Sequence, residues 1–269
     1  MLTADVNEKG VLDVDTVKGC AAGMSARRDG GCYNACYAAT IAKFRGLDFT
    51  HSVTRTVQNK AQADQIVRAV KAAPEGFFRI GTMGDPCHAW ETTVETIEWL
   101  SPYAVPVIIT KHWIKATDEQ LLRLIACGTV LNTSISALDT PAELRHRERE
   151  IARYSSLGGH SIARIVSCDF DPLNSEGARM AQVQERLFAY PHVIDNPLRV
   201  YRTHKLVQDG VIKLSSVKDL SAVRTISIAN VDTYIGHCSD CKDKCGLSSM
   251  PKDHPVPLSP QSTLFMETA

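Results

Sequence analysis

Six of the nine cysteines in this 269-residue chain fall into two groups of three, and these groups are its clearest indication of chemistry. The first group, Cys20, Cys32 and Cys36, has the spacing C-x11-C-x3-C in a glycine-rich segment. Three thiolates on one loop could hold three irons of a four-iron, four-sulfur (4Fe–4S) cluster and leave the fourth iron open. A three-cysteine zinc site with a fourth ligand elsewhere, or buried free thiols, are the alternatives.

The second group, Cys238, Cys241 and Cys245, has the spacing C-x2-C-x3-C in the segment HCSDCKDKCG. The C-x2-C step is a common chelating arrangement, because a tight turn lets both sulfurs point at one metal. We expect a second, auxiliary iron–sulfur cluster here, with a zinc knuckle as the alternative. The fourth ligand is unassigned, and His237 and His254 are the candidates nearby.

The other three cysteines occur singly. Cys87 and Cys168 each follow an expected strand, where a thiol could face a substrate, although an inert buried position is the preferred interpretation. Cys127 lies at the opposite end of its expected strand–helix unit and is interpreted as structural.

Apolar, β-branched stretches alternate with helical patterns along most of the chain. Such alternation is typical of βαβ units in an α/β fold with a parallel sheet, whose chemistry collects at the carboxyl ends of the strands. Periodicity alone does not separate an incomplete barrel from a doubly wound sheet. Strands are expected at residues 11–17, 77–81, 105–110, 129–136, 162–167 and 193–200, and helices at 33–45, 90–100, 118–126, 141–157 and 176–189.

Composition narrows the class of protein. With 44% hydrophobic and 22% charged residues the chain can bury a sizeable core, which excludes a disordered protein. Thirty basic and thirty acidic residues give a formal net charge of zero, which argues against broad nucleic-acid binding. The chain shows no apolar run long enough to span a membrane and no secretory signal at its start, so we expect no membrane association and a cytoplasmic location.

The cysteine loop between a strand and a helix, followed by GTMGDP after the next strand, resembles the radical S-adenosylmethionine (SAM) superfamily. The segments TVLNTSISALD and REREIARYSSLGGHSIARIVSCDFDP resemble that family's fourth strand, and its fifth strand with the preceding helix. The family's commonest loop reads C-x3-C-x2-C. Cys32 and Cys36 match its first step, Ala39 occupies the third position, and Cys20 would replace the missing ligand. Within that superfamily, the chain resembles the spore photoproduct lyase branch.

The resemblance implies a partial (βα)6 TIM-like barrel over residues 1–203 and a C-terminal cysteine-rich extension over residues 204–269. It also implies that the open iron binds SAM, whose one-electron cleavage gives methionine and a 5′-deoxyadenosyl radical that abstracts hydrogen from a substrate. Asp85 would accept from the SAM ammonium group, and Arg164 would reach its carboxylate. The implied SAM-binding residues are Gly81, Thr82, Met83, Gly84, Asp85, Asn132, Ser134, Ser136 and Arg164.

Two further expectations concern partners. The substrate would be a small molecule, or one base or side chain of a polymer, because no added recognition domain is evident. The electron would come from a donor such as a flavodoxin or ferredoxin. A non-catalytic iron–sulfur or zinc protein, serving structure or electron transfer, is the alternative; it would not need GTMGDP and SISALD at adjacent strand ends.

Overall fold

The computed structural model describes residues 1–26, 31–215, 225–226 and 233–251. Its centre is a seven-stranded sheet in the order β1-β2-β5-β6-β7-β8-β10, in which only β1 and β2 are antiparallel. The α/β class with a mostly parallel sheet is therefore confirmed. The strands of this sheet are β1 (Asp5–Val6), β2 (Leu12–Asp13), β5 (Phe77–Ile80), β6 (Val105–Thr110), β7 (Val130–Ile135), β8 (His160–Ile165) and β10 (Val193–Asp195).

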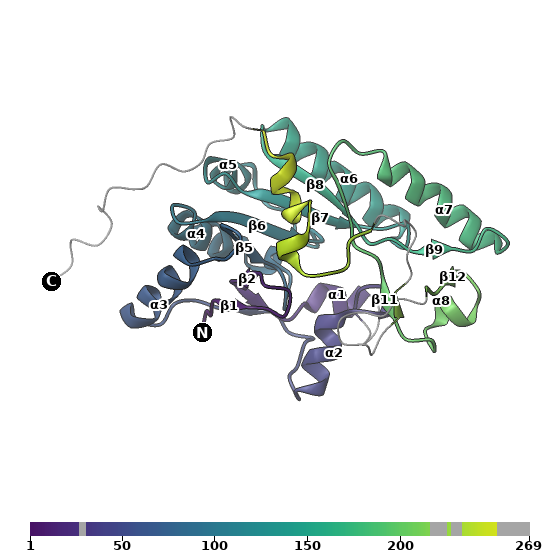
Figure 1. The fold of residues 1–269 in the computed structure, drawn as a ribbon, viewed down its shortest axis with the longest axis horizontal. Coiled ribbons are helices and arrows are strands. Elements are labelled where there is room, and N and C mark those ends of the chain that lie inside the picture. The colour runs from purple at the N-terminus through teal and green to yellow at the C-terminus, as the bar shows by residue number, and fades with distance from the viewer. Residues whose placement is uncertain (27–30, 216–224, 227–232, 252–269) are drawn as a thin grey trace.

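Six parallel strands follow one another across the sheet in chain order, without a point at which the order reverses. Because strand–helix–strand crossovers are right-handed, a sequential order places the connecting helices on one face of the sheet. Figure 1 shows the C-terminal segment, in yellow, on the opposite side of the sheet from α4 and α5. The helices are α1 (Ala21–Ala26), α2 (Tyr37–Phe44), α3 (Lys60–Lys71), α4 (Trp90–Leu100), α5 (Asp118–Ala126), α6 (Pro141–Ser156), α7 (Ser175–Phe188) and α8 (Lys205–Gln208).

Short elements complete the fold outside the central sheet. Three two-stranded pairs lie around it, and four 3-10 turns carry several of the residues discussed below. The pairs are β3 (Val17–Lys18) with β4 (Val53–Thr54), β9 (Asp169–Phe170) with β12 (Ile212–Lys213), and β11 (Arg199–Val200) with β13 (Thr225–Ile226). The turns are η1 (Cys32–Asn34), η2 (Pro86–Ala89), η3 (Cys238–Asp240) and η4 (Lys244–Ser249).

Local sequence signals fix several helix ends. Thr117 and Gln120 form a capping box at the start of α5, and Thr140 and Glu143 form another at the start of α6. Each box satisfies backbone N–H groups that the first helical turn leaves unpaired. Pro141 follows at the first position of α6, where a missing N–H costs little.

Four elements differ from the expectation. The strand expected at 193–200 is two short strands, β10 and β11, which belong to different sheets. The strand expected at 11–17 is two short strands, β2 and β3, because the chain leaves the sheet near Asp15. The helix expected from residue 33 begins at Tyr37, after the turn η1. Helix α3 was not expected; it is amphipathic, begins at the Asn59 cap and buries Ile66 and Val70.

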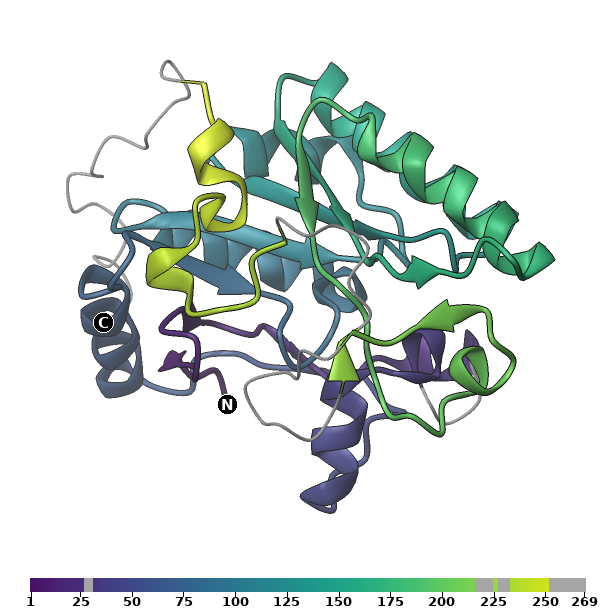
Figure 2. The same cartoon turned by 45° about the vertical axis from the view of Figure 1, so that its right-hand side comes forward.

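Two apolar layers enclose the sheet. The larger layer lies between the sheet and its helices and includes Phe78, Ile80 and Ile97. On the other face, Phe77 and Val130 pack with Cys245 of the C-terminal segment. That segment also hydrogen-bonds to the sheet: the Asn132 Nδ2 donates to the Cys245 carbonyl at 3.0 Å. Residues 238–251 therefore complete the core on this face (Figure 2).

No helix in the described part of the chain has the length and apolar character needed to cross a membrane.

Candidate functional site

The first cysteine group comes together at one end of the sheet. Cys20 follows β3, Cys32 lies in η1, and Cys36 caps the start of α2. Gly23 lies between two of the sulfurs: a Cβ there would stand 2.7 Å from the Cys20 Sγ and 3.5 Å from the Cys32 Sγ. Only a residue without a side chain leaves this space between the thiols open.

Cys20 and Cys36 belong to one buried cluster that also contains Ala39. Ala39 is the position at which the commonest radical SAM loop has its third cysteine. In the fold, Cys20 therefore lies in the same cluster as Ala39. Spacing along the sequence does not reveal this proximity, because Cys20 lies far from Ala39 along the chain.

The GTMGDP loop packs directly against the cysteine loop. Gly19 forms a parallel bridge with Gly84, and its N–H donates to the Met83 carbonyl at 3.0 Å. A Cβ at Gly84 would stand 2.4 Å from the Val17 carbonyl oxygen, so this approach requires glycine. The residue next to Gly19 is Cys20, and the bridge therefore joins the glycine motif to the first thiol.

The carboxylate of Asp15 fixes the backbone of the GTMGDP loop by hydrogen bonds. This carboxylate accepts backbone N–H groups from Gly81 and Thr82 at 2.8 Å and from Met83 at 2.7 Å. Burial raises the pKa of this carboxyl, and the three backbone hydrogen bonds act in the opposite direction. Sequence reasoning missed Asp15; its only signal is an acidic residue just after an apolar strand. The Tyr37 hydroxyl adds a fourth contact, donating to the Thr82 carbonyl at 2.5 Å.

The Asp85 carboxylate ties the GTMGDP loop to the end of β6. One oxygen accepts from the Thr110 hydroxyl at 2.6 Å and from the Cys87 N–H at 3.1 Å. The other accepts from the Lys111 N–H at 2.9 Å. These bonds hold Asp85 as a cap of η2 and as a link between neighbouring strand ends.

The other residues implied to bind SAM lie on β7, just beyond its end, and on β8. Ser134 is paired in register with Arg164 across β7 and β8, and Asn132 lies two residues earlier on β7. Ser136 lies beyond the end of β7 and donates to the Val166 carbonyl at 2.6 Å, which locks the chain turn there. Asn132 contacts the C-terminal segment, as described above, and Arg164 lines a cavity with the second cysteine group.

A buried network of charges adjoins Cys32. The Lys111 Nζ donates to the Tyr33 hydroxyl at 2.5 Å, and that hydroxyl donates to Asp139 at 2.6 Å. Arg147 forms an ion pair with Asp139 and donates to the Lys111 carbonyl at 3.1 Å. Burial raises the pKa of Cys32 to about 11, while the charges of Lys111 and Arg147 act in the opposite direction. These two cations can offset negative charge on thiolates at this site.

Tyr33 has a φ of 60°, in the left-handed region that a bulky residue seldom adopts. Asn34, with a φ of 55°, shares this conformation. The turn between Cys32 and Cys36 is therefore built from backbone that costs free energy, and the buried contacts of the Tyr33 side chain hold it in place.

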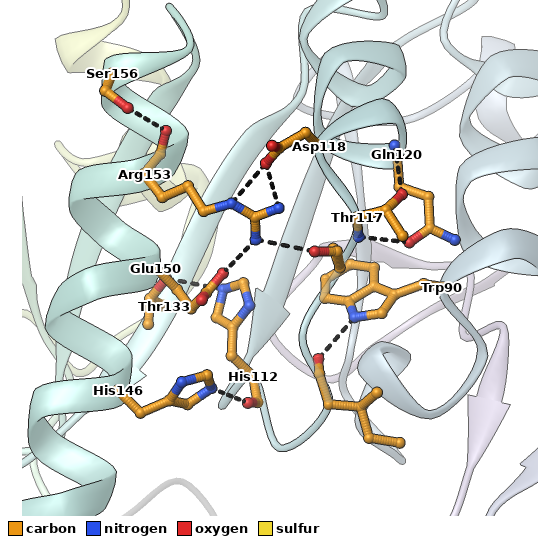
Figure 3. Close-up of polar contacts among 12 residues, drawn as sticks. Trp90, His112, Thr117, Asp118, Gln120, Thr133, His146, Glu150, Arg153 and Ser156 are labelled. Atoms are coloured by element: carbon orange, nitrogen blue, oxygen red, sulfur yellow. Dashed lines mark hydrogen bonds and ion pairs between the residues drawn. The ribbon is translucent and has the colours of Figure 1, made fainter.

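His112 follows Lys111 in the chain, and Figure 3 shows its own polar contacts. Its Nε2 is 3.1 Å from the Thr133 hydroxyl, its ring stacks at a tilt on Trp90, and its carbonyl accepts from His146 of α6. Burial lowers the pKa of His112 to about 3, so the neutral ring is the native form.

We expect the burial of His112 to make the protein less stable in acid. Its folded pKa is below the unfolded value near 6.5, so the unfolded chain takes up the proton first as the pH falls. The unfolding free energy should drop by about 2 kcal/mol more between pH 7 and pH 5 than in His112→Asn, which keeps a polar residue tolerant of a φ of 51°. Urea unfolding of both proteins at the two pH values measures this. An equal pH dependence would contradict it.

The second cysteine group lies on the other face of the sheet from the connecting helices. Cys238 begins η3, Cys241 follows it, and Cys245 is buried in η4 against Val130 and Ile162. His237 lies outside this core, with its Nδ1 3.0 Å from the Ser239 hydroxyl. The other candidate for a fourth ligand, His254, falls outside the described residues, as do residues 216–224 and 252–269 of the expected extension.

All nine cysteines are free thiols. Cys87 is buried in the core beneath the helices, Cys168 is buried with Phe170 and Met180, and Cys127 ends α5. In the described ranges no three or more His, Cys, Asp or Glu side chains are grouped so that they could hold a single metal ion as they stand.

Comparison with known proteins finds no matching family model, no similar curated protein and no similar solved structure.

Proposed function

We propose that this chain is a radical SAM-like enzyme with a partial (βα)6 barrel, whose first cysteine group holds a 4Fe–4S cluster. The observation that carries the proposal is the Gly19–Gly84 bridge, which sets the GTMGDP loop against the cysteine loop. An enzyme of this class needs SAM and three thiolates in one place. A protein that merely stores a metal has no need for a glycine-rich loop packed beside its ligands. The sequential strand order agrees with an open barrel.

The residues present fit such a cluster. The space that a Cβ at Gly23 would fill separates two of the sulfurs, and Lys111 and Arg147 supply buried positive charge nearby. Thiolates of a four-iron cluster bind different irons, so they stand farther apart than the ligands of one zinc ion. A looser grouping of the three thiols is thus compatible with a cluster, which would supply the single electron that cleaves SAM.

The protein's own groups would then position and enclose SAM. Backbone of the Gly81–Gly84 loop, fixed by Asp15, would present its polar groups to the methionine end, and Ser134 would approach from β7. The buried contacts of Trp113 with Arg147 and of Tyr33 with Lys111 would keep water from this end of the sheet. The substrate would be a small molecule or one base or side chain, and a flavodoxin or ferredoxin would deliver the electron.

Anaerobic reconstitution with iron and sulfide tests this function. About eight irons per chain, with 5′-deoxyadenosine formed from SAM after reduction, would support both clusters and the cleavage. The non-catalytic alternative predicts bound metal without cleavage. Zinc in place of iron, or no cleavage after verified loading, would overturn the proposal.

Cys241→Ala should separate the two cysteine groups. We expect its iron content to fall by about half, to the four irons of one cluster, while cleavage of SAM persists because the first group is intact. The variant Cys32→Ala/Cys241→Ala should bind almost none. If Cys241→Ala alone lost all iron, the six thiols would serve one shared site, and the division into two would be wrong. Metal analysis of the protein as purified distinguishes a cluster from a zinc knuckle.

A further inference from the structure

A cavity of about 270 Å³ lies between the sheet and the second cysteine group. Its walls come from β5, β8 and β10, from the loop before β2, and from the C-terminal segment. All three sulfur-bearing residues of the second group line it. The cavity is slightly smaller than the pockets of about 300–1,000 Å³ that hold drug-sized ligands. Its volume therefore suits a small ligand or one end of a larger ligand.

The lining of this cavity holds more cations than carboxylates. Four cationic side chains face two carboxylates, those of Asp195 and Asp243, together with the three thiols of the second cysteine group. Asp195 is already engaged, because it accepts from the Ser167 hydroxyl at 2.5 Å and also from Thr233. The four cationic residues are Lys9, Arg79, Arg164 and Arg199.

Two of the four cations have partners within the protein. Arg79 forms an ion pair with Asp13 at 2.9 Å, and Arg199 donates to the Pro197 carbonyl at 3.0 Å. In the part of the chain that the structure describes, the Lys9 ammonium and the Arg164 guanidinium make no hydrogen bond or ion pair.

We infer that this cavity binds the phosphate of a small phosphomonoester, held by Lys9 and Arg164. Two unpaired cations match a group that carries about −1.5 to −2 charges at pH 7, whereas a single carboxylate would leave one cation unmatched. Arginine and lysine are also the usual phosphate-binding residues, the first through its paired N–H donors. The inference assigns Arg164 to this phosphate in place of the SAM carboxylate.

Isothermal titration calorimetry with inorganic phosphate on the full chain tests the site. We expect a dissociation constant below about 1 mM at pH 7.5 and low salt. Lys9→Gln and Arg164→Gln should each weaken binding about tenfold or more, the loss expected for one charge-assisted hydrogen bond. Arg202→Gln, which removes an exposed arginine outside the cavity lining, should leave it unchanged. Circular dichroism verifies that each variant is folded.

Three results would overturn the inference: no phosphate binding, equal affinity in all variants, or acetate binding as tightly as phosphate. A fourth is that Arg164→Gln weakens SAM and leaves phosphate unchanged, which would return Arg164 to the SAM carboxylate. The titration uses protein both without and with iron. Phosphate binding by the iron-free protein keeps this inference separate from the proposed cluster chemistry, so either can fail without the other.

Discussion

Cys32→Ala is expected to reduce the formation of 5′-deoxyadenosine from SAM to the background of the assay. Cys32 is the central thiol of its group, because its sulfur flanks Gly23 with Cys20 and its turn leads to Cys36. Removing it leaves two thiolates, and a cluster with two protein ligands on this loop would not persist. Iron should fall to the content of the second group alone.

Cys127→Ala is the matched control for this substitution. It makes the same chemical change in a buried cysteine at the end of α5, in the core beneath the helices and away from the loop. We expect it to keep both iron and cleavage activity. Full cleavage by Cys32→Ala would show that the first group is not the catalytic site, and equal loss in both variants would point to a general effect on folding.

Asp15→Ala is expected to lower the unfolding free energy by about 3–5 kcal/mol. The substitution removes the acceptor of three backbone N–H groups, and each buried donor left without a partner costs about 1–3 kcal/mol before water or relaxation recovers part of it. The GTMGDP loop should also lose its fixed shape. SAM binding should therefore weaken, even in protein that remains folded at low temperature.

Two variants make the Asp15 result specific. Asp15→Asn keeps one acceptor oxygen and places an amide N–H₂ against the other donors, so its loss of stability should be intermediate. Asp64→Ala, on the exposed side of α3, should change the unfolding free energy by less than about 0.5 kcal/mol. Chemical denaturation followed by circular dichroism measures all three. A change for Asp15→Ala no larger than that for Asp64→Ala would contradict the role given to its carboxylate.

Sequence patterns predicted much of the fold, because many helices and strands are marked by the residues within them. The bounds of β6, α4 and α5 match the expected ranges, since a continuous apolar run, an amphipathic face and a capping box mark them in the sequence. Helix α3 was not predicted although its sequence carries helical signals. Ile66 and Val70 are spaced one turn apart and buried, Val67 and Ala69 pack beside them, and Asn59 caps the start.

The site was only partly accessible to sequence reasoning. Thiols could be grouped by spacing, because ligands of one site often lie close along the chain. The contacts of Asp15 and of Asp85 could not be predicted from spacing, because each depends on which strand ends become neighbours. The closeness of Cys20 to Ala39 has the same origin. Contacts between distant segments are decided by the tertiary fold, and no local pattern records them.

The packing of the C-terminal segment has a consequence for biosynthesis. Asn132 meets the Cys245 carbonyl across 113 residues, and His160 meets the Gly246 carbonyl across 86. Residues such as Phe77 and Val130, which that segment covers, are translated long before it. This face of the sheet therefore stays apolar and uncovered until residues 238–251 have left the ribosome, and the nascent chain is exposed to aggregation and to chaperones during this interval.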